Sequence, residues 1–297
     1  MINTIYNEDC LDTMSRMEDG FCDLILTSCP YDNLRKYGGG KNYHQRLNDT
    51  GYSFEFEKIA KELTRVLKDG GVIFWNVADQ TIKGSRTGNS MRQALYFMEE
   101  CGLNLHDHII WQKTGTPFPS NVRYRNVWEN CFVFSKGKPN VFNPIQVKNK
   151  TAGAVRYSRR FRNHNGEFVE GMSGVKINEY RNEDNVWLIS NGANKSYKGD
   201  LDITDHPAIM TEELVRRGIV SYTNEGMIVY DPFLGSSTTT RVARDNNRRW
   251  IGSEIHTPYF DLAKKIMGIN KPQTVEEFHA QEMNKWGGGV NINVNEG

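Results

Sequence analysis

The stretch that decides the fold is Asp231-Pro232-Phe233-Leu234-Gly235-Ser236-Ser237-Thr238-Thr239, which directly follows the apolar run Met227–Tyr230. The apolar run predicts a buried strand, and the small residues of the turn let the backbone approach a ligand closely. Ser236 or Ser237 can cap the helix that we expect near Ser237–Asn246. The segment therefore predicts a strand, a turn and a helix within an α/β sheet.

A second acidic residue completes this pattern. The next predicted strand, Trp250–Gly252, is followed by Glu254, which stands 23 residues after Asp231. In doubly wound nucleotide-binding folds, a carboxylate about 20 residues after the turn binds ribose hydroxyls. An ordinary α/β scaffold explains the same residues without a ligand, so the motif alone leaves both interpretations open.

Working outward, another apolar run, Cys22–Thr27, leads into Ser28-Cys29-Pro30-Tyr31. These four residues suit methyl transfer to an exocyclic amine, whose nitrogen lone pair is delocalised into its ring. The Ser28 hydroxyl and the Cys29 carbonyl can accept the two N–H bonds, which frees the lone pair and positions the nitrogen. Tyr31 can stack on a base taken out of the duplex, and Pro30 stiffens the turn. A plain surface turn remains the alternative.

The remaining apolar patterns predict alternating helices and strands. They are a helix from Phe56 to Leu67 closed by Gly70-Gly71, a strand Val72–Val77, a helix Asn89–Cys101, strands His108–Trp111 and Cys131–Phe134, and a helix near Thr211–Arg217. Such alternation favours a doubly wound, mostly parallel sheet with helices on both faces, for which we expect seven strands.

A polar and basic segment interrupts this pattern at 140–195. Between Asn143 and Gly166 there is no acidic residue, and Tyr157 and Phe161 are interleaved with the cations. The cations are Lys148, Lys150, Arg156, Arg159, Arg160 and Arg162. This combination predicts contacts with DNA phosphates. An exposed basic loop explains the segment equally well.

Composition narrows the class of protein. The 297 residues are 38% hydrophobic and 25% charged with a net charge of +1, which favours a packed α/β domain over disorder. Five cysteines without C-x-x-C spacing argue against a disulfide framework and a zinc site, and we expect no metal. No run approaches the roughly 20 apolar residues of a membrane span. The first residues show no signal-peptide pattern, so we expect a cytoplasmic protein.

Together the two motifs resemble those of the DNA amino-methyltransferases, whose catalytic motif reads (D/N/S)-P-P-(Y/F/W) and whose cofactor motif reads D-P-F-x-G-S-G-T. The order, catalytic motif first, resembles the permuted β arrangement of that family. The resemblance implies a Rossmann-like fold that binds S-adenosylmethionine and methylates adenine N6 or cytosine N4 of a flipped base in double-stranded DNA. It implies a catalytic half at 1–139, a target-recognition insert at 140–195, a cofactor-binding half at 196–270 and a peripheral tail at 271–297.

Further segments extend the resemblance over nearly the whole chain. Asn7–Leu11 is similar to the family's G-D-C-L segment, which implies that Asp9 and Cys10 lie near the cofactor adenine. Asp205–Ala208 resembles the H-P segment before the cofactor motif. Ile110–Lys113 and Trp128–Asn130 resemble the strand pair that lines the base pocket. The resemblance implies that the cofactor is bound by Asp9, Cys10, Asp231, Phe233, Gly235, Ser236, Ser237, Thr238 and Glu254.

Three residues or segments depart from the family pattern. Cys29 replaces the usual first proline, which puts the carbonyl geometry beside the target amine in doubt. Ser237 replaces the second glycine of the cofactor motif, a mild change because we expect that the turn does not need a positive φ there. The H-P segment lacks the lysine-proline that often follows it. No group that the mechanism needs is lost.

Other functions fit less well. A cytosine-C5 methyltransferase has its nucleophile in Pro-Cys order, whereas this chain has Cys29-Pro30. Amino-methyltransferases acting on RNA or protein place the cofactor motif first. A non-catalytic DNA-binding protein of the same fold stays open as an alternative. Ser28 favours cytosine N4 as the target, although adenine N6 stays open. The recognition sequence, a homodimer and a restriction-enzyme partner are not determined by the sequence.

Overall fold

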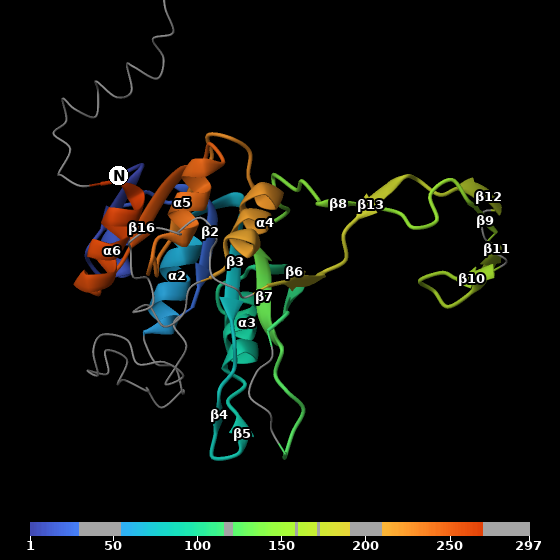
Figure 1. Cartoon of the computed structure of the whole chain (residues 1–297), viewed down its shortest axis with the longest axis horizontal. Coiled ribbons are helices and arrows are strands. Elements are labelled where there is room, and N and C mark those ends of the chain that lie inside the picture. Colours follow the sequence, from blue (N-terminus) through green and yellow to red (C-terminus); the bar gives the residue numbers. More distant parts are fainter. Residues whose placement is uncertain (30–54, 116–120, 158–159, 171–172, 191–209, 270–297) are drawn as a thin grey trace, which may run out of the picture.

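The computed structural model describes residues 1–29, 55–115, 121–157, 160–170, 173–190 and 210–269 (Figure 1). Its centre is an eight-stranded sheet. In spatial order the strands are β1 (Thr4–Tyr6), β16 (Arg249–Ser253), β15 (Ile228–Asp231), β2 (Cys22–Ser28), β3 (Leu67–Val77), β7 (Trp128–Ser135), β6 (Asn104–Lys113) and β14 (Val186–Ile189). Only β7 runs antiparallel to its neighbours within this described sheet. The mostly parallel α/β fold is confirmed, with one strand more than the seven expected.

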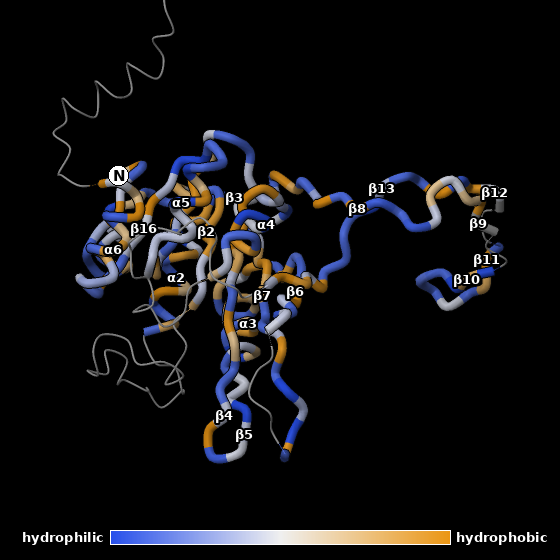
Figure 2. Tube along the Cα trace, in the orientation of Figure 1, coloured by the Kyte–Doolittle hydropathy of each residue, from blue (hydrophilic) through white to orange (hydrophobic). Residues whose placement is uncertain are grey.

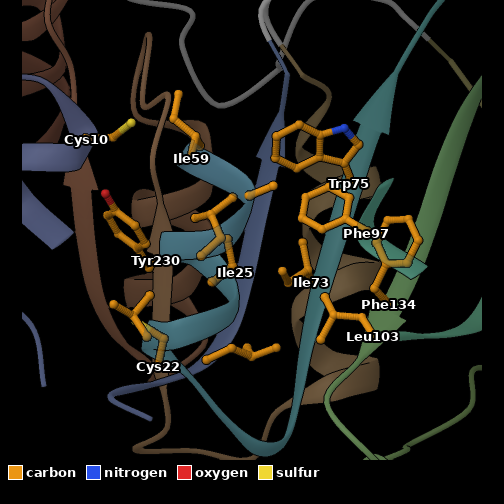
Figure 3. Close-up of a cluster of buried hydrophobic side chains, with 14 of the residues drawn as sticks. Cys10, Cys22, Ile25, Ile59, Ile73, Trp75, Phe97, Leu103, Phe134 and Tyr230 are labelled. Atoms are coloured by element: carbon orange, nitrogen blue, oxygen red, sulfur yellow. The ribbon is translucent and has the colours of Figure 1, made fainter. Parts of the chain in front are cut away.

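Helices cover both faces of the sheet. They are α1 (Cys10–Ser15), α2 (Phe56–Val66), α3 (Asn89–Glu99), α4 (Glu212–Tyr222), α5 (Thr238–Asp245) and α6 (Thr257–Met267). Side chains of α1, α2 and α3 pack with Ile25 and Ile73 on one face (Figure 3). Side chains of α4, α5 and α6 pack with Leu24 and Phe74 on the other. Successive strand residues thus serve opposite faces, as the two-residue period of a strand requires.

The junction between α2 and β3 differs from the expectation. Gly70-Gly71 was expected to close the helix, but α2 ends at Val66 and β3 already begins at Leu67. Leu67 is fully buried and pairs with Cys22, and the register then shifts before Leu24 pairs with Val72. Burial of Leu67 against β2 therefore ends the helix early, and the two glycines lie within the irregular part of the strand.

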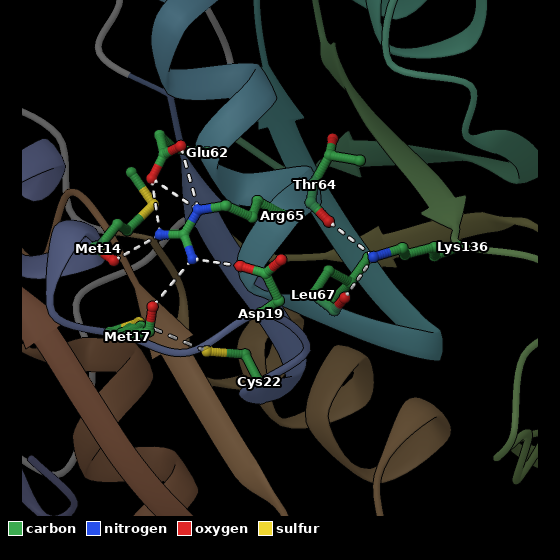
Figure 4. A network of polar contacts seen from close by, with 9 residues as sticks. All are labelled: Met14, Met17, Asp19, Cys22, Glu62, Thr64, Arg65, Leu67 and Lys136. Carbon is green, nitrogen blue, oxygen red and sulfur yellow. Dashed lines mark hydrogen bonds and ion pairs between the residues drawn. The ribbon is translucent and has the colours of Figure 1, made fainter.

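A polar network fixes α1 against α2 (Figure 4). The Arg65 guanidinium donates to the carbonyl oxygens of Met14 and Met17 at 2.7 and 2.9 Å. It also pairs with Asp19 and Glu62, each at 2.7 Å. The last carbonyls of a helix have no partner within the helix, so the arginine supplies donors at the C-terminal end of α1 and ties that end to α2.

Residues 146–182 form an arm that extends away from the sheet (Figure 1). Three antiparallel strand pairs are nested in it: β8 (Gln146–Lys148) with β13 (Tyr180–Asn182), β9 (Val155–Tyr157) with β12 (Ser173–Lys176), and β10 (Arg160–Arg162) with β11 (Phe168–Glu170). At its base the Glu183 N–H donates to the Ile145 carbonyl at 2.8 Å. The arm is therefore one long, interrupted hairpin.

A second, short hairpin joins β4 (Thr81–Ile82) to β5 (Ser85–Arg86).

The predicted insert at 140–195 thus contains two different kinds of structure. The arm lies outside the sheet, whereas β14 pairs in parallel with β6 and Trp187 packs in the core. Ile189 accepts a hydrogen bond from the Trp111 indole at 3.1 Å, which fastens β14 to the sheet.

Candidate active site

The carboxyl ends of β1, β16, β15, β2 and β3 meet at one edge of the sheet, here called the carboxyl edge. β2 ends there at Ser28, β15 ends at Asp231, and Glu254 follows β16. The Asn7 side-chain amide, which follows β1, donates to the Glu254 carbonyl at 2.8 Å. Both sequence motifs and the N-terminal segment therefore come together at this edge, where open α/β sheets bind ligands.

A buried hydrogen bond joins the two motifs across 204 residues of sequence. The Thr27 hydroxyl donates to Asp231 Oδ1 at 2.7 Å, and the Phe233 N–H donates to the same oxygen at 3.0 Å. Burial raises the pKa of Asp231 to about 6, against the hydrogen bonds that lower it. Thr27 was not among the expected site residues. Its one signal in the sequence is a hydroxyl at the end of an apolar run, next to Ser28.

The turn after Asp231 needs two residues with positive φ. Gly235 has a φ of 52° and Ser237 a φ of 68°, so the expectation that residue 237 does not need a positive φ was wrong. Left-handed backbone in a non-glycine residue costs roughly 1–2 kcal/mol. Ser237 precedes α5, and its hydroxyl lies 2.5 Å from the Thr240 hydroxyl. That hydrogen bond offsets part of the strain.

Glu254 is held by two backbone donors. Its Oε2 accepts from the Gly235 N–H and its Oε1 from the His256 N–H, both at 2.8 Å. Burial raises the pKa of Glu254 to about 7, and the nearby charge of Asp231 adds to this effect. Each carboxylate oxygen keeps a further lone pair for a ligand hydroxyl. The residue is thus fixed in place and able to accept more hydrogen bonds.

Asp9 and Cys10 begin α1 beside this site. Asp9 is the N-cap residue, and its Oδ1 accepts from the Leu11 N–H at 2.8 Å. Cys10 is buried, and burial raises the pKa of its thiol well above the ordinary value. Asp9 thus has a structural role in the helix cap, and a thiol with a raised pKa stays neutral.

Ser28 and Cys29 continue β2 along β3. Ser28 pairs with Asn76 in register, and the Cys29 N–H donates to the Asn76 carbonyl at 2.9 Å. Cys29 is only 1% exposed. Pro30, Tyr31 and the Asp205–Ala208 segment lie outside the described residues.

The strands expected to line the base pocket do pair. Ile110 pairs with Asn130 and Trp111 with Glu129, across β6 and β7. The Asn76 side-chain amide donates to Glu129 Oε2 at 3.2 Å, and Glu129 forms an ion pair with Lys113. A polar network therefore connects β3, β6 and β7, and it includes Asn76, the residue that pairs with Ser28.

The basic residues of the arm are mostly exposed. Lys148 lies in β8, 3.6 Å from a Glu179 carboxylate oxygen, and Lys150 follows it. Arg160 and Arg162 are exposed in β10, and the Arg162 guanidinium lies 4.8 Å from the centre of the Phe168 ring. Arg156 lies in β9, and only its backbone is described. Arg159 lies outside the described residues.

No group of three or more His, Cys, Asp or Glu residues in the described part of the chain could hold a metal ion. None of the described helices has the length and apolar character needed to cross a membrane.

Comparisons with known proteins place these observations in one family. The family model described as DNA methylase, of the N6/N4 type, matches residues 22–265. The orphan methyltransferase M.BamHII of Bacillus amyloliquefaciens is 44% identical over 245 residues, which are 82% of this chain and 87% of that protein. The type II methyltransferase M.BglII of Bacillus subtilis is 30% identical over 90% of this chain and 69% of its own.

Solved structures share the fold. The cytosine-N4-specific PvuII DNA methyltransferase superposes with a TM-score of 0.64 at 20% identity, covering 95% of this chain and 91% of its own. The M1.HpyAVI–SAM complex superposes with a TM-score of 0.55 at 20% identity, covering 89% and 98%. At this identity the likeness concerns the fold.

Proposed function

The chain belongs to the N6/N4 family of DNA methylases and is a DNA methyltransferase, and from this premise we propose how its residues carry out the transfer. The carboxyl edge binds S-adenosylmethionine beside Asp231 and Glu254 and receives a flipped base beside Ser28 and Cys29. The observation that carries this assignment is the Thr27–Asp231 hydrogen bond, because it holds the catalytic and cofactor motifs side by side.

The residues at the edge fit a nucleoside cofactor. Glu254 has lone pairs left for the ribose hydroxyls after it has accepted from Gly235 and His256. Phe233 and Ser236 belong to the turn after Asp231, Thr238 begins α5, and Asp9 and Cys10 begin α1 beside this turn. The chemistry that the cofactor supplies is a methyl group on a positively charged sulfonium.

Ser28 and Cys29 activate the base by accepting hydrogen bonds. The Ser28 hydroxyl and the Cys29 carbonyl take the two amino N–H bonds, and Tyr31 stacks on the base. Held in this way, the amino nitrogen would direct its lone pair at the methyl donor and would pass its surplus proton to solvent water. No strong base is needed, because positioning lowers most of the barrier. Ser28 favours cytosine N4 over adenine N6.

The arm is the part of the predicted insert that reads the DNA target. Its cations, Lys148, Lys150, Arg156, Arg159, Arg160 and Arg162, contact phosphates, and the four of them whose side chains are described, Lys148, Lys150, Arg160 and Arg162, are exposed. A two-stranded ribbon has the right width for the major groove, which supports this role. β14 pairs with β6 in the sheet, so within the predicted insert 140–195 we assign target recognition to the arm, residues 146–182.

The setting of the enzyme is part of the same proposal. We place it in the cytoplasm, together with the DNA that it methylates. The molar mass in solution, measured with and without DNA, tests whether the protein is a homodimer. A restriction-enzyme partner would be an enzyme that cuts the unmethylated target site and does not cut the same site after methylation by this protein.

The decisive experiment is labelled methyl transfer to unmethylated genomic DNA, with the product nucleosides separated by mass spectrometry. We expect N4-methylcytosine. N6-methyladenine would keep the reaction class and change the base.

The Ser28→Ala variant should lose about 100-fold in rate and keep cofactor binding, because one preorganised acceptor is lost. Ser15→Ala, an exposed serine of α1, is the matched control. Cofactor binding with no transfer to DNA would favour the non-catalytic alternative or an RNA or protein substrate.

A further inference from the structure

Cys29 stands where the family motif has a proline, and the structure holds it by hydrogen bonds that a proline could not make. Its N–H donates to the Asn76 carbonyl at 2.9 Å, which lengthens the β2–β3 ladder by one residue. Its Sγ accepts from the Gln93 side-chain amide at 3.8 Å. Proline fixes its own φ and has no N–H, whereas cysteine has a free φ. Something else must therefore fix the carbonyl of residue 29.

Gln93 of α3 has an amide orientation that is set by its other neighbour. The Trp75 indole N–H donates to Gln93 Oε1 at 2.9 Å. An indole N–H is only a donor, so it must face the oxygen of the amide, and the NH₂ group then faces Cys29. Trp75 is itself fixed by ring contacts with Phe56 and Phe97, at centroid distances of 6.0 and 5.3 Å. Figure 3 shows Trp75 beside Phe97.

All members of this chain of contacts are buried. Gln93 is 3% exposed, and Trp75 is fully buried. Water therefore does not compete for these hydrogen bonds. Through them, Gln93 of α3 contacts both Trp75 of β3 and Cys29 of the catalytic motif.

We propose that Gln93 is a positioning residue that, with the Asn76 carbonyl, clamps Cys29 and so replaces the rigidity of the missing proline. The proposal rests on the proposed function, because the carbonyl that it fixes is the one assigned to the target amine. Gln93 does not contact the substrate; it acts through Cys29.

The test compares Gln93→Met, Cys29→Ala, the double variant and a matched control, all at a temperature well below unfolding. The control is Cys22→Ala, because Cys22 is a buried thiol at the opposite end of the same strand, with its Sγ 4.0 Å from the sulfur of Met17. Gln93→Met should lower the single-turnover rate of methyl transfer about tenfold, since small misplacement of reacting groups is costly, while the KM for DNA changes less than twofold. Cys22→Ala should leave both unchanged.

The double variant isolates the contact. If Gln93 acts through Cys29, the double variant is no slower than the slower single variant. Rates that multiply instead would overturn the proposal, and so would an unchanged rate in Gln93→Met.

A second readout does not depend on activity. Native-state alkylation followed by mass spectrometry measures the labelling rates of Cys29 and Cys22 in one molecule. Gln93→Met should speed labelling of Cys29 about tenfold and leave Cys22 unchanged. Unchanged labelling of Cys29 would refute the clamp. Faster labelling in a protein that transfers no methyl group to DNA would support the clamp and contradict the proposed function instead.

Discussion

The sheet and the arm of this protein are built in opposite ways. The sheet buries apolar side chains on both faces under six helices, and its central strands are almost entirely inaccessible. In the arm, no described side chain is buried, and Phe161, Phe168 and Tyr180 are exposed. Figure 2 shows that hydrophilic stretches alternate with short hydrophobic ones along the arm. A two-stranded ribbon without a core is marginally stable by itself. The sheet is thus stabilised by its own buried side chains. The arm has exposed side chains that are suited to pack against a partner.

The contrast is tested most strongly by removing the arm. Replacing residues 146–182 with a short glycine linker keeps Ile145 and Glu183 together, because their backbones already form a hydrogen bond. We expect site-specific methylation to fall about 1,000-fold or more, since specific binding exceeds non-specific binding by at least that factor. Cofactor binding and Tm should change little. Wild-type methylation by this variant would show that the arm does not read the target.

Two phenylalanines give a matched pair. Phe97 is fully buried among Phe56, Trp75 and Phe134, whereas Phe168 is 65% exposed on the arm. Phe97→Ala should lower the free energy of unfolding by about 3–5 kcal/mol. Phe168→Ala should change it by less than about 0.5 kcal/mol and should weaken DNA binding instead. Equal losses of stability in a urea titration would contradict the contrast.

The raised pKa of Glu254, at the carboxyl edge of the sheet, predicts how the stability of the protein depends on pH. Its folded pKa of about 7 lies above its ordinary value of 4.5, so the folded protein binds more protons than the unfolded chain between these values. The stability of the free protein therefore falls as pH rises from about 4.5 to about 7. Glu254→Gln should remove the part of this decline that Glu254 contributes, so the fall in Tm between pH 5 and pH 8 should be smaller in the variant than in the wild type. Its cofactor binding should weaken, because an amide accepts fewer hydrogen bonds from a ribose. A wild-type pH profile in the variant would refute the assignment.

The smallest expected effect concerns salt. Replacing Arg160 and Arg162 with glutamine should reduce the slope of log K for DNA binding against log salt concentration by about two, because each lost phosphate contact releases about one counterion fewer. The Tm should stay the same, since both side chains are exposed. An unchanged slope would mean that these arginines do not contact phosphates.

The central strands of the sheet could be predicted from the sequence, whereas its edge strands and one helix end could not. Strands buried on both faces appear as continuous apolar runs, so Cys22–Thr27 and Met227–Tyr230 predicted the two strands that carry the motifs. The edge strand β1 has only three residues, and β14 is four apolar residues within a polar segment, which hid it. Helix ends set by tertiary contacts, such as that of α2 at Val66, were not visible either.

The site shows a similar limit. The motifs gave Ser28, Asp231 and Glu254 their expected places at one edge of the sheet. The hydrogen bonds of Thr27 and Gln93 join residues that are distant in sequence, so no local pattern signals them. The roles of the site residues stay predictions until the variants are measured.

The position of β2 has a consequence for synthesis of the chain. β2 lies between β3 and β15, and Thr27 and Asp231 are 204 residues apart. A ribosome adds about 5–20 residues per second, so β2 waits roughly 10 to 40 s for its second neighbour to be made. During that time one edge of the apolar strand β2 has no pairing partner, because β15 has not yet been made. The central sheet can be completed only after the C-terminal segments leave the ribosome. Slowing translation after residue 140 should therefore lengthen the period in which the nascent chain is prone to aggregate.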